Sequence, residues 1–247
     1  MYKKHLQLYS LKDEVKGDFE KTLRKVKEIG YDGVEFFGGY YGNLSAADMK
    51  KLLGEIGLEP ISSHVVTSSI AAQVEYAAEL GIRYLIDPYA DFKDYEAACD
   101  FSQKLNEAGK LCKQRGIVFG YHNHAHEFAP CKDGFLLETV IENTDPELVC
   151  FQLDVGWAEY AGVNATDFLG KYPDRFKSIH FKECGDVEAP EDWNVAAGKG
   201  KVDWESVFKA SFAQGIDCFI VEREHDYAGD IYKCVKEDYD YISRLLE

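Results

Sequence analysis

Seven apolar segments of this chain each end on a side chain that can bind a metal ion or transfer a proton. These side chains are Glu35, His64, Asp87, His122, Asp154, His180 and Glu222. Carboxylate oxygens and imidazole nitrogens are ligands of divalent ions and also act as general acids and bases. Because such residues recur at the ends of successive strand-like segments, we expect them to line one shared pocket.

The elements that would position these side chains alternate between helical patterns and short apolar runs. Several helix-like stretches end on a glycine that an apolar run follows within three residues: Gly30, Gly57, Gly81, Gly116 and Gly215. Glycine supplies the left-handed helix stop, and the run after it is the next strand. The expected strands span residues 5–10, 33–37, 58–64, 82–87, 117–122, 148–154, 176–182 and 217–222.

Eight such alternations predict an α/β fold, a single (β/α)8 TIM barrel over residues 1–247 with its site at the C-terminal ends of the strands. Ser45 and Asp203 stand at expected helix N-caps. The least complete repeat is the fifth, which has only residues 135–143 for its helix. An open doubly wound sheet fits less well, because no Gly-rich phosphate turn follows the first strand.

Charge and composition exclude several classes of protein. A net charge of −16 repels phosphate backbones, so we expect no nucleic-acid partner. The first 15 residues hold too few apolar side chains for a signal peptide or a membrane span, which predicts a cytoplasmic protein without a membrane partner. The seven cysteines include no CxxC pair and predict no disulfide framework. A monomer and a homo-oligomer both stay open.

Metal chemistry could be located where three of the expected strands end. Asp154, His180 and Glu222 would converge at the barrel mouth, and their oxygen and imidazole ligands suit one divalent ion such as Mn, Co, Zn or Mg. Each of them alone could instead be hydrogen-bonded to nearby backbone. His122, the last residue of the fifth strand, is the candidate fourth ligand.

The loop after the fifth strand adds two further candidates, His124 and Glu127. Either could bind substrate, support His122, or replace it as the ligand. If a metal holds His122 as a neutral imidazole, that ring is a poor base, and proton transfer on its side would depend on another group such as His124 or Glu127.

Several short motifs, taken in order, resemble a known family. They are QLYSL, GYDGVEFFG, YHNHAHEF, FQLDVGW, SIHFKE, GKGKVDW and IVERE. The chain resembles, over nearly its whole length, the sugar phosphate isomerase and epimerase group of the xylose isomerase-like barrels, which also includes endonuclease IV and inosose dehydratase. The resemblance implies a Glu, Asp, His, Glu metal set, and hence Asp154, His180 and Glu222 as ligands. The chain departs from that pattern at His122, where most members have glutamate, and at Trp157, where many have histidine.

The chemistry that the resemblance implies is removal of a proton next to a carbonyl of a small sugar, through a metal-stabilised enediolate. Glu222 is the expected base. Lys182 could hold a developing oxyanion, or it could pair with Glu183 or Asp186 at the rim.

Other residues are expected around the substrate. Glu35 and His64 would line the far side of the pocket and either hydrogen-bond to sugar hydroxyls or act as accessory acids. Trp157 either offers an apolar face to the sugar or begins the sixth helix and packs on the rim. Asp87 precedes a proline and could simply end its strand, and residues 184–201 form either a lid or a surface excursion.

The sequence therefore predicts a metal-dependent isomerase or epimerase of a small sugar or sugar derivative. A lyase of the inosose dehydratase type is an alternative that the histidine-rich fifth strand favours. A non-catalytic sugar-binding barrel is a further alternative, and the net charge disfavours an endonuclease. The residues do not decide whether the substrate carries a phosphate.

Overall fold

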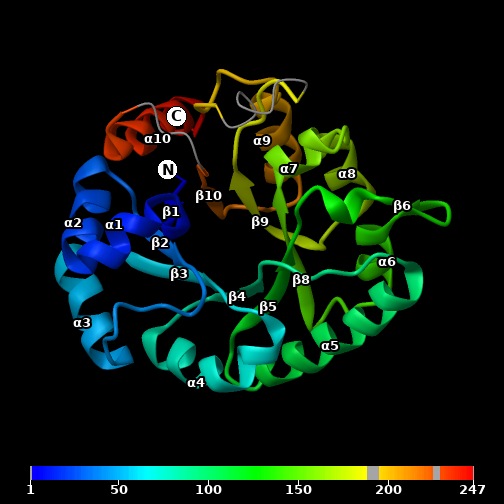
Figure 1. The fold of residues 1–247 in the computed structure, drawn as a ribbon, viewed down its shortest axis with the longest axis horizontal. Helices are drawn as coiled ribbons and strands as arrows, with labels where there is room; N and C mark the ends of the chain where they lie inside the picture. The colour runs from blue at the N-terminus through cyan, green and yellow to red at the C-terminus, as the bar shows by residue number, and fades with distance from the viewer. Residues whose placement is uncertain (1, 188–194, 225–228, 247) are drawn as a thin grey trace.

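Eight parallel strands close into a barrel in the computed structural model, which describes residues 2–187, 195–224 and 229–246 (Figure 1). Around the barrel the strand order is β1-β10-β9-β8-β5-β4-β3-β2, and β1 pairs with both β2 and β10. The strands are β1 (Lys4–Gln7), β2 (Gly33–Phe36), β3 (Glu59–His64), β4 (Tyr84–Asp87), β5 (Val118–His122), β8 (Val149–Asp154), β9 (Phe176–Phe181) and β10 (Phe219–Val221). The predicted TIM barrel is confirmed.

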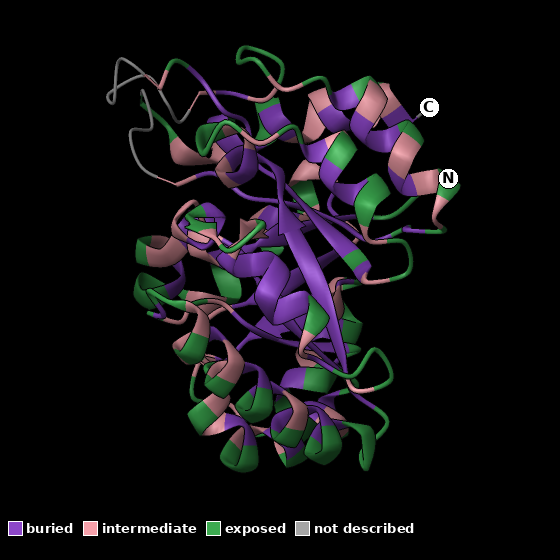
Figure 2. Cartoon of the chain, turned by 90° about the vertical axis from the view of Figure 1, so that its right-hand side faces the viewer, coloured by how far each residue is buried: buried purple, intermediate pink, exposed green. Residues whose placement is uncertain are grey.

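A ring of helices surrounds the strands, and the two chain ends lie near each other outside the barrel (Figures 1 and 2). The α-helices are α1 (Lys12–Gly17), α2 (Phe19–Ile29), α3 (Ala46–Ile56), α4 (Ile70–Leu80), α5 (Tyr95–Lys113), α6 (Leu136–Glu142), α7 (Val155–Tyr160), α8 (Ala165–Lys171), α9 (Trp204–Ala213) and α10 (Ile231–Leu246). Three short 3-10 helices, η1 (Leu8–Leu11), η2 (Thr67–Ser69) and η3 (His126–Phe128), and a hairpin of β6 (Pro130–Cys131) and β7 (Gly134–Phe135) complete the described elements.

Local sequence accounts for the helix ends. The Ser45 side chain accepts a hydrogen bond from the Asp48 N–H and caps α3, and Asp203 caps α9 in the same way. Helix α3 ends at Gly57, whose φ of 81° is a conformation that glycine adopts without strain. In the described part of the chain, no helix combines the length and apolar character needed to cross a bilayer.

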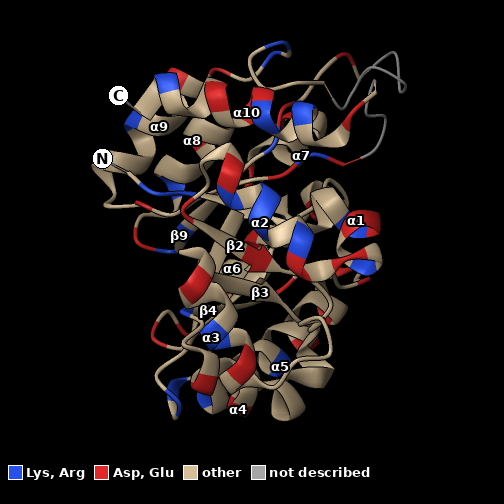
Figure 3. Ribbon diagram, turned by 90° about the vertical axis from the view of Figure 1, so that its left-hand side faces the viewer, with Lys and Arg blue, Asp and Glu red and all other residues tan. Residues whose placement is uncertain are grey.

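The core has two parts that follow from the alternation of side chains along each strand. On β8, for example, Phe151 and Leu153 pack outward against the helices, whereas Cys150 points into the barrel. Inside the barrel, an apolar cluster is formed by Ile61, Tyr84, Ile86, Cys150, Cys218 and Ile220. Figure 2 shows the strands as buried, and Figure 3 shows charges of both signs on outer helices such as α1, α2 and α10.

The first strand is shorter than its predicted span of residues 5–10. It ends at Gln7, and residues 8–11 form η1 instead. The Gln7 side chain accepts a hydrogen bond from the Tyr9 N–H, which turns the chain out of the sheet at this point. The apolar pattern continues through η1, so periodicity alone did not reveal the strand end.

Candidate functional site

Four side chains from four neighbouring strand ends meet at the C-terminal mouth of the barrel. His122 ends β5, Asp154 ends β8, His180 lies in β9, and Glu222 follows β10. One ligand atom from each lies within 4.8 Å of the others, and all four residues are buried. The structure thus brings together the residues in which the sequence predicted a metal site.

The spacing of these atoms fits a divalent ion. The distance from Asp154 Oδ2 to His122 Nε2 is 3.8 Å and to His180 Nδ1 is 3.7 Å, and the distance from His180 Nδ1 to Glu222 Oε2 is 2.9 Å. Ligands about 2.1 Å from one ion lie about 3.0–3.4 Å apart, so small shifts would accommodate it. Among the described residues, no group makes a well-formed hydrogen bond to the buried Asp154 Oδ2. The neighbours of this oxygen include the Lys182 ammonium at 3.3 Å, and a cation at the centre of the cluster would give it a closer partner.

The electrostatic field of the cluster also favours a cation. Burial alone would lower the pKa of His180, but the adjacent Glu35 and Glu222 carboxylates outweigh it and raise that pKa to about 10. Burial raises the pKa of Asp154 to about 6, although Lys182 opposes the shift. Negative charge is therefore in excess where the four ligand atoms meet.

Lys182 lies beside the cluster and is fully buried. Its Nζ is 3.3 Å from Asp154 Oδ2, 3.0 Å from Glu222 Oε2 and 3.0 Å from Glu224 Oε1. The alternative pairing with Glu183 is not seen, because the Glu183 carboxylate accepts hydrogen bonds from loop N–H groups and from the Trp204 indole. Lys182 thus bridges three carboxylates at the site.

A polar layer below the cluster contains residues expected around the substrate. Glu35 is completely buried, and its Oε1 atom is 2.6 Å from His180 Nε2 and 3.0 Å from His64 Nε2. Gln152 joins this layer, with its Oε1 atom 2.9 Å from His64 Nε2 and 2.9 Å from His122 Nδ1. The role of Gln152 as a partner of two imidazoles was missed, although its place two residues before Asp154 on one strand face was a usable signal.

The loop after β5 carries two candidate site residues, His124 and Glu127, and their side chains have different surroundings. The His124 ring borders the cavity, and burial together with the charge of Lys182 lowers its pKa to about 3. The Glu127 carboxylate accepts hydrogen bonds from the Tyr121 hydroxyl at 2.5 Å and from the His124 N–H at 2.8 Å. Of His122 and Glu127, it is therefore His122 that belongs to the four-residue cluster.

Trp157 belongs to α7, which is one of its two expected placements, and its ring lies 5.4 Å from that of His124 and 5.1 Å from Lys182 Nζ. Its expected contact with a sugar stays a prediction. Asp87 turns away from this group, because its carboxylate accepts hydrogen bonds from the Thr67 and Tyr89 N–H groups. The predicted lid over residues 184–201 falls partly outside the described residues.

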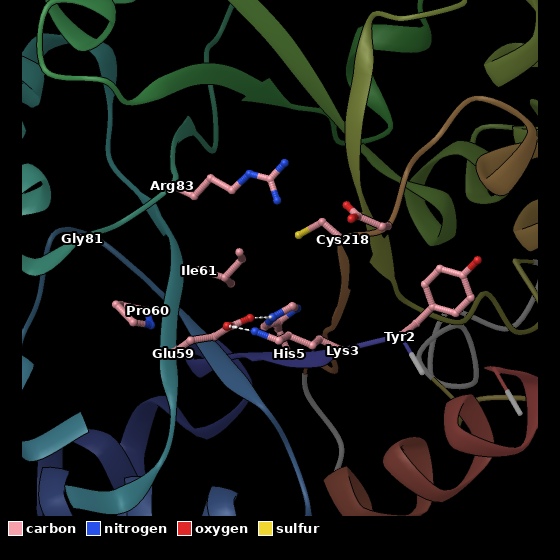
Figure 4. Close-up of a pocket in the computed structure, with 10 residues that line it drawn as sticks. Tyr2, Lys3, His5, Glu59, Pro60, Ile61, Gly81, Arg83 and Cys218 are labelled. Atoms are coloured by element: carbon pink, nitrogen blue, oxygen red, sulfur yellow. Dashed lines mark hydrogen bonds and ion pairs between the residues drawn. The ribbon is translucent and has the colours of Figure 1, made fainter. Parts of the chain in front are cut away.

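A cavity of about 320 Å³ opens above the cluster. It is lined by Tyr9, Phe37, Gly38, His64, Pro88, Tyr89, His122, His124, Glu222 and Glu224. A second cavity, of about 480 Å³, lies at the other end of the barrel, where Lys3 and His5 contact Glu59, and Arg83 points toward Cys218 (Figure 4). The cluster of possible metal ligands borders only the first of these two cavities.

Comparison with known proteins agrees with this geometry. The family described as a xylose isomerase-like TIM barrel matches residues 23–244. Inosose dehydratase from Clostridium beijerinckii is 29% identical, over 85% of this chain and 83% of that protein. Inosose dehydratase from Geobacillus kaustophilus is 24% identical, over 92% of this chain and 87% of that protein. A solved sugar phosphate isomerase/epimerase from Parabacteroides distasonis is 30% identical, covers 99% of this chain and 98% of its own, and superposes with a TM-score of 0.83.

Proposed function

Because the chain belongs to the xylose isomerase-like TIM barrel family, we propose that it is a metal-dependent isomerase or epimerase of a small keto sugar or sugar derivative. The protein is an enzyme, like the relatives it matches. The observation that carries the proposed reaction is the cluster of His122, Asp154, His180 and Glu222 directly below a cavity. The reaction begins with removal of a proton from the carbon next to a carbonyl group.

The metal would be held by His122, Asp154, His180 and Glu222. When bound, a divalent ion supplies Lewis-acid stabilisation of the negative charge that develops on the substrate oxygen. Glu35 lies below the metal ligands rather than in the cavity lining, so we assign it the role of holding His180 instead of the expected contact with sugar hydroxyls.

Glu222 is the proposed base. Burial would raise the pKa of its carboxyl, but the charges of Lys182 and His180 hold that pKa well below the usual range, so the group is ionised at neutral pH. Its Oε2 atom contacts both Lys182 and His180, which fixes the carboxylate while the side chain borders the cavity. The second oxygen, Oε1, is the atom assigned to take the substrate proton.

His124 lines the same cavity as Glu222 and is the proposed second proton-transfer group. As a neutral imidazole it would polarise a substrate oxygen by donating a hydrogen bond, or would give its ring hydrogen to the face of the carbon opposite Glu222 and be reprotonated by Glu222 or solvent. Glu127 holds the His124 backbone in place through a hydrogen bond to its N–H, so we assign Glu127 a positioning role. Trp157, Tyr89 and Tyr9 would supply apolar surface for the C–H face of a sugar.

The lining also indicates an unphosphorylated substrate. Among the residues that the structure describes, those bordering the cavity include two glutamates, Glu222 and Glu224, and neither lysine nor arginine. Lys182, just below, is already shared by three carboxylates. A phosphate dianion would meet net negative charge here, so we propose a neutral keto sugar or keto polyol.

Dehydration is the second candidate, because the matched curated relatives are inosose dehydratases and the two proton-transfer groups are unlike each other. In that reaction Glu222 takes the proton from carbon, the C–O bond of the neighbouring hydroxyl breaks as a C=C bond forms, and His124 protonates the departing oxygen. The proton that His124 gives up returns to it from Glu222 or solvent, and one water is released.

One experiment separates these outcomes. The metal-loaded enzyme is incubated in heavy water with a panel of keto sugars and keto polyols, each with its phosphate ester where available, and followed by NMR and mass spectrometry. Deuterium uptake at the carbon beside the carbonyl, without loss of mass, supports the isomerase or epimerase. Loss of one water with a new near-ultraviolet absorbance supports the dehydratase. Neither change with any substrate, by an enzyme that holds its metal, contradicts the proposed reaction.

A further inference from the structure

The polar layer beneath the metal cluster is a chain of hydrogen bonds whose direction is fixed at one end. The backbone N–H of Tyr9, which can only donate, bonds to Gln7 Oε1 at 3.0 Å. The Gln7 amide nitrogen must therefore face Glu35, to whose Oε1 it donates at 2.7 Å. Glu35 thus enters the network as an acceptor.

The other neighbours of Glu35 follow from this. Ser62 Oγ donates to Glu35 Oε2 at 2.6 Å, and His180 Nε2 lies 2.6 Å from Oε1. An ionised carboxylate only accepts, so His180 carries a hydrogen on Nε2. Nδ1 faces Asp154 and the ionised Glu222 carboxylate, which also only accepts, so in the metal-free protein Nδ1 carries a second hydrogen. A bound cation would replace that hydrogen and take the Nδ1 lone pair.

Gln152 fixes the position of the ring hydrogen on the second imidazole, that of His122. Its Nε2 donates to Glu35 Oε2 at 3.0 Å, so its amide oxygen must lie on the opposite side, 2.9 Å from His122 Nδ1 and 2.9 Å from His64 Nε2. An amide oxygen only accepts, and His122 therefore carries its hydrogen on Nδ1. Its lone pair is on Nε2, the nitrogen that faces Asp154.

We propose that Gln152 is a positioning residue that fixes the tautomer of His122, and that Glu35 and Gln152 together turn two imidazole lone pairs toward one cation. This inference rests on the metal site of the proposed function and adds which divalent ion that site would prefer. Two nitrogen and two oxygen donors favour a divalent transition ion such as Co²⁺ or Zn²⁺ over Mg²⁺, which prefers oxygen ligands alone.

The first test uses the metal-free protein with ¹⁵N-labelled histidine. Long-range ¹H–¹⁵N spectra distinguish a protonated ring nitrogen from an unprotonated one, and the His122→Asn variant assigns the signals. Wild-type protein is expected to show hydrogen on Nδ1 of His122, and Gln152→Met is expected to shift His122 toward the other tautomer. The control is Gln214→Met, because Gln214 bonds to the Leu169 carbonyl far from the cluster and should leave His122 unchanged.

The second test measures affinity for Co²⁺ and Mg²⁺ by competition with a chelator, with the visible spectrum of bound Co²⁺ as a further readout of its ligands. Gln152→Met is expected to weaken Co²⁺ binding by about 10–100-fold, and Gln214→Met to leave it unchanged. Wild-type protein is expected to prefer Co²⁺ to Mg²⁺ by about 100-fold or more.

Three outcomes overturn the inference. One is hydrogen on Nε2 of His122 in wild-type protein, a measurement that needs no variant and stands even if Gln152→Met fails to fold. The second is an unchanged tautomer or unchanged Co²⁺ affinity in Gln152→Met. The third is equal affinity for Co²⁺ and Mg²⁺. A wild-type protein that binds no divalent ion would instead contradict the proposed metal site, while the tautomer spectra would still decide the role of Gln152.

Discussion

The two ends of the barrel each hold a cavity in which a histidine meets a glutamate, but their charges are balanced at only one of them. At the N-terminal end, the Glu59 carboxylate contacts both Lys3 and His5 (Figure 4). At the C-terminal end the proportions are reversed, and the single ammonium of Lys182 is shared among three carboxylates.

Burial makes this difference matter. The Lys3 side chain is 61% exposed, whereas that of Lys182 is not exposed at all. An exposed pair is screened by water and contributes little, but excess buried charge is unfavourable unless something compensates it. A fold retains such an excess where a cation or a reaction uses it. We therefore propose that the smaller, C-terminal cavity is the functional one, although the N-terminal cavity has the larger volume.

Neutralising one glutamate at each end of the barrel tests the difference between the two cavities most directly. Glu222→Gln should reduce deuterium exchange by about 10²–10⁴-fold in kcat/KM, because it removes the proposed base. Glu59→Gln should leave exchange unchanged, since Glu59 lies at the opposite end of the barrel. Circular dichroism would check that both variants fold. Exchange retained by Glu222→Gln would count against its role as the base.

Removing one lysine at each end tests the charge argument without any substrate. In metal-free protein, Lys182→Met should lower the free energy of unfolding by about 3–5 kcal/mol, because it leaves the buried Asp154 and Glu222 and the partly buried Glu224 without their shared ammonium. Lys3→Met should lower it by less than about 1 kcal/mol. Urea unfolding of both variants gives the values, and similar losses at the two ends would refute the distinction.

Metal addition should stabilise the protein only through the C-terminal end. Co²⁺ at about 100 times its dissociation constant should raise the free energy of unfolding by about 2.7 kcal/mol, and a chelator should reverse the gain. Asp154→Asn should lose most of this response, because it weakens the ligand whose Oδ2 atom lies 3.8 Å from His122 Nε2 and 3.7 Å from His180 Nδ1. Glu59→Gln should keep it. A full response in Asp154→Asn would place the ion elsewhere.

The sequence allowed the barrel and the meeting of Asp154, His180 and Glu222 to be predicted for one physical reason. Parallel strands separated by helices bring their carboxyl ends to one face, so residues remote in sequence become neighbours by topology alone. The same rule also placed Asp87 in the shared pocket. Its carboxylate instead accepts hydrogen bonds from the Thr67 and Tyr89 N–H groups, and the position of a residue at a strand end does not predict such loop contacts.

Contacts that depend on side-chain direction were harder to foresee. Gln152 lies on the inward face of its strand, but its two imidazole partners come from β3 and β5, and no periodicity specifies which side chains meet across a barrel. Glu127 was an open candidate for the metal site because it follows His122 closely. The chain turns through η3 at that point and carries the carboxylate to the Tyr121 hydroxyl instead.

The smallest expected effect is a pH dependence at the N-terminal end. Burial would raise the pKa of Glu59, but hydrogen bonds and charge from His5 and Lys3 lower it from 4.5 to about 2. A depressed carboxyl pKa stabilises the fold above the unfolded-state value and loses that contribution as the pH falls from about 4.5 toward 2.

Glu59→Gln should therefore lower the free energy of unfolding at neutral pH by about 1–2 kcal/mol, a figure reduced for solvent screening because the carboxylate is partly exposed. The difference between variant and wild type should shrink steadily as the pH falls below about 4.5, which urea unfolding at a series of pH values would show. A difference that stays constant with pH would mean that Glu59 acts through packing rather than charge. The balanced charges at the N-terminal end would then no longer contrast with the excess negative charge at the C-terminal end.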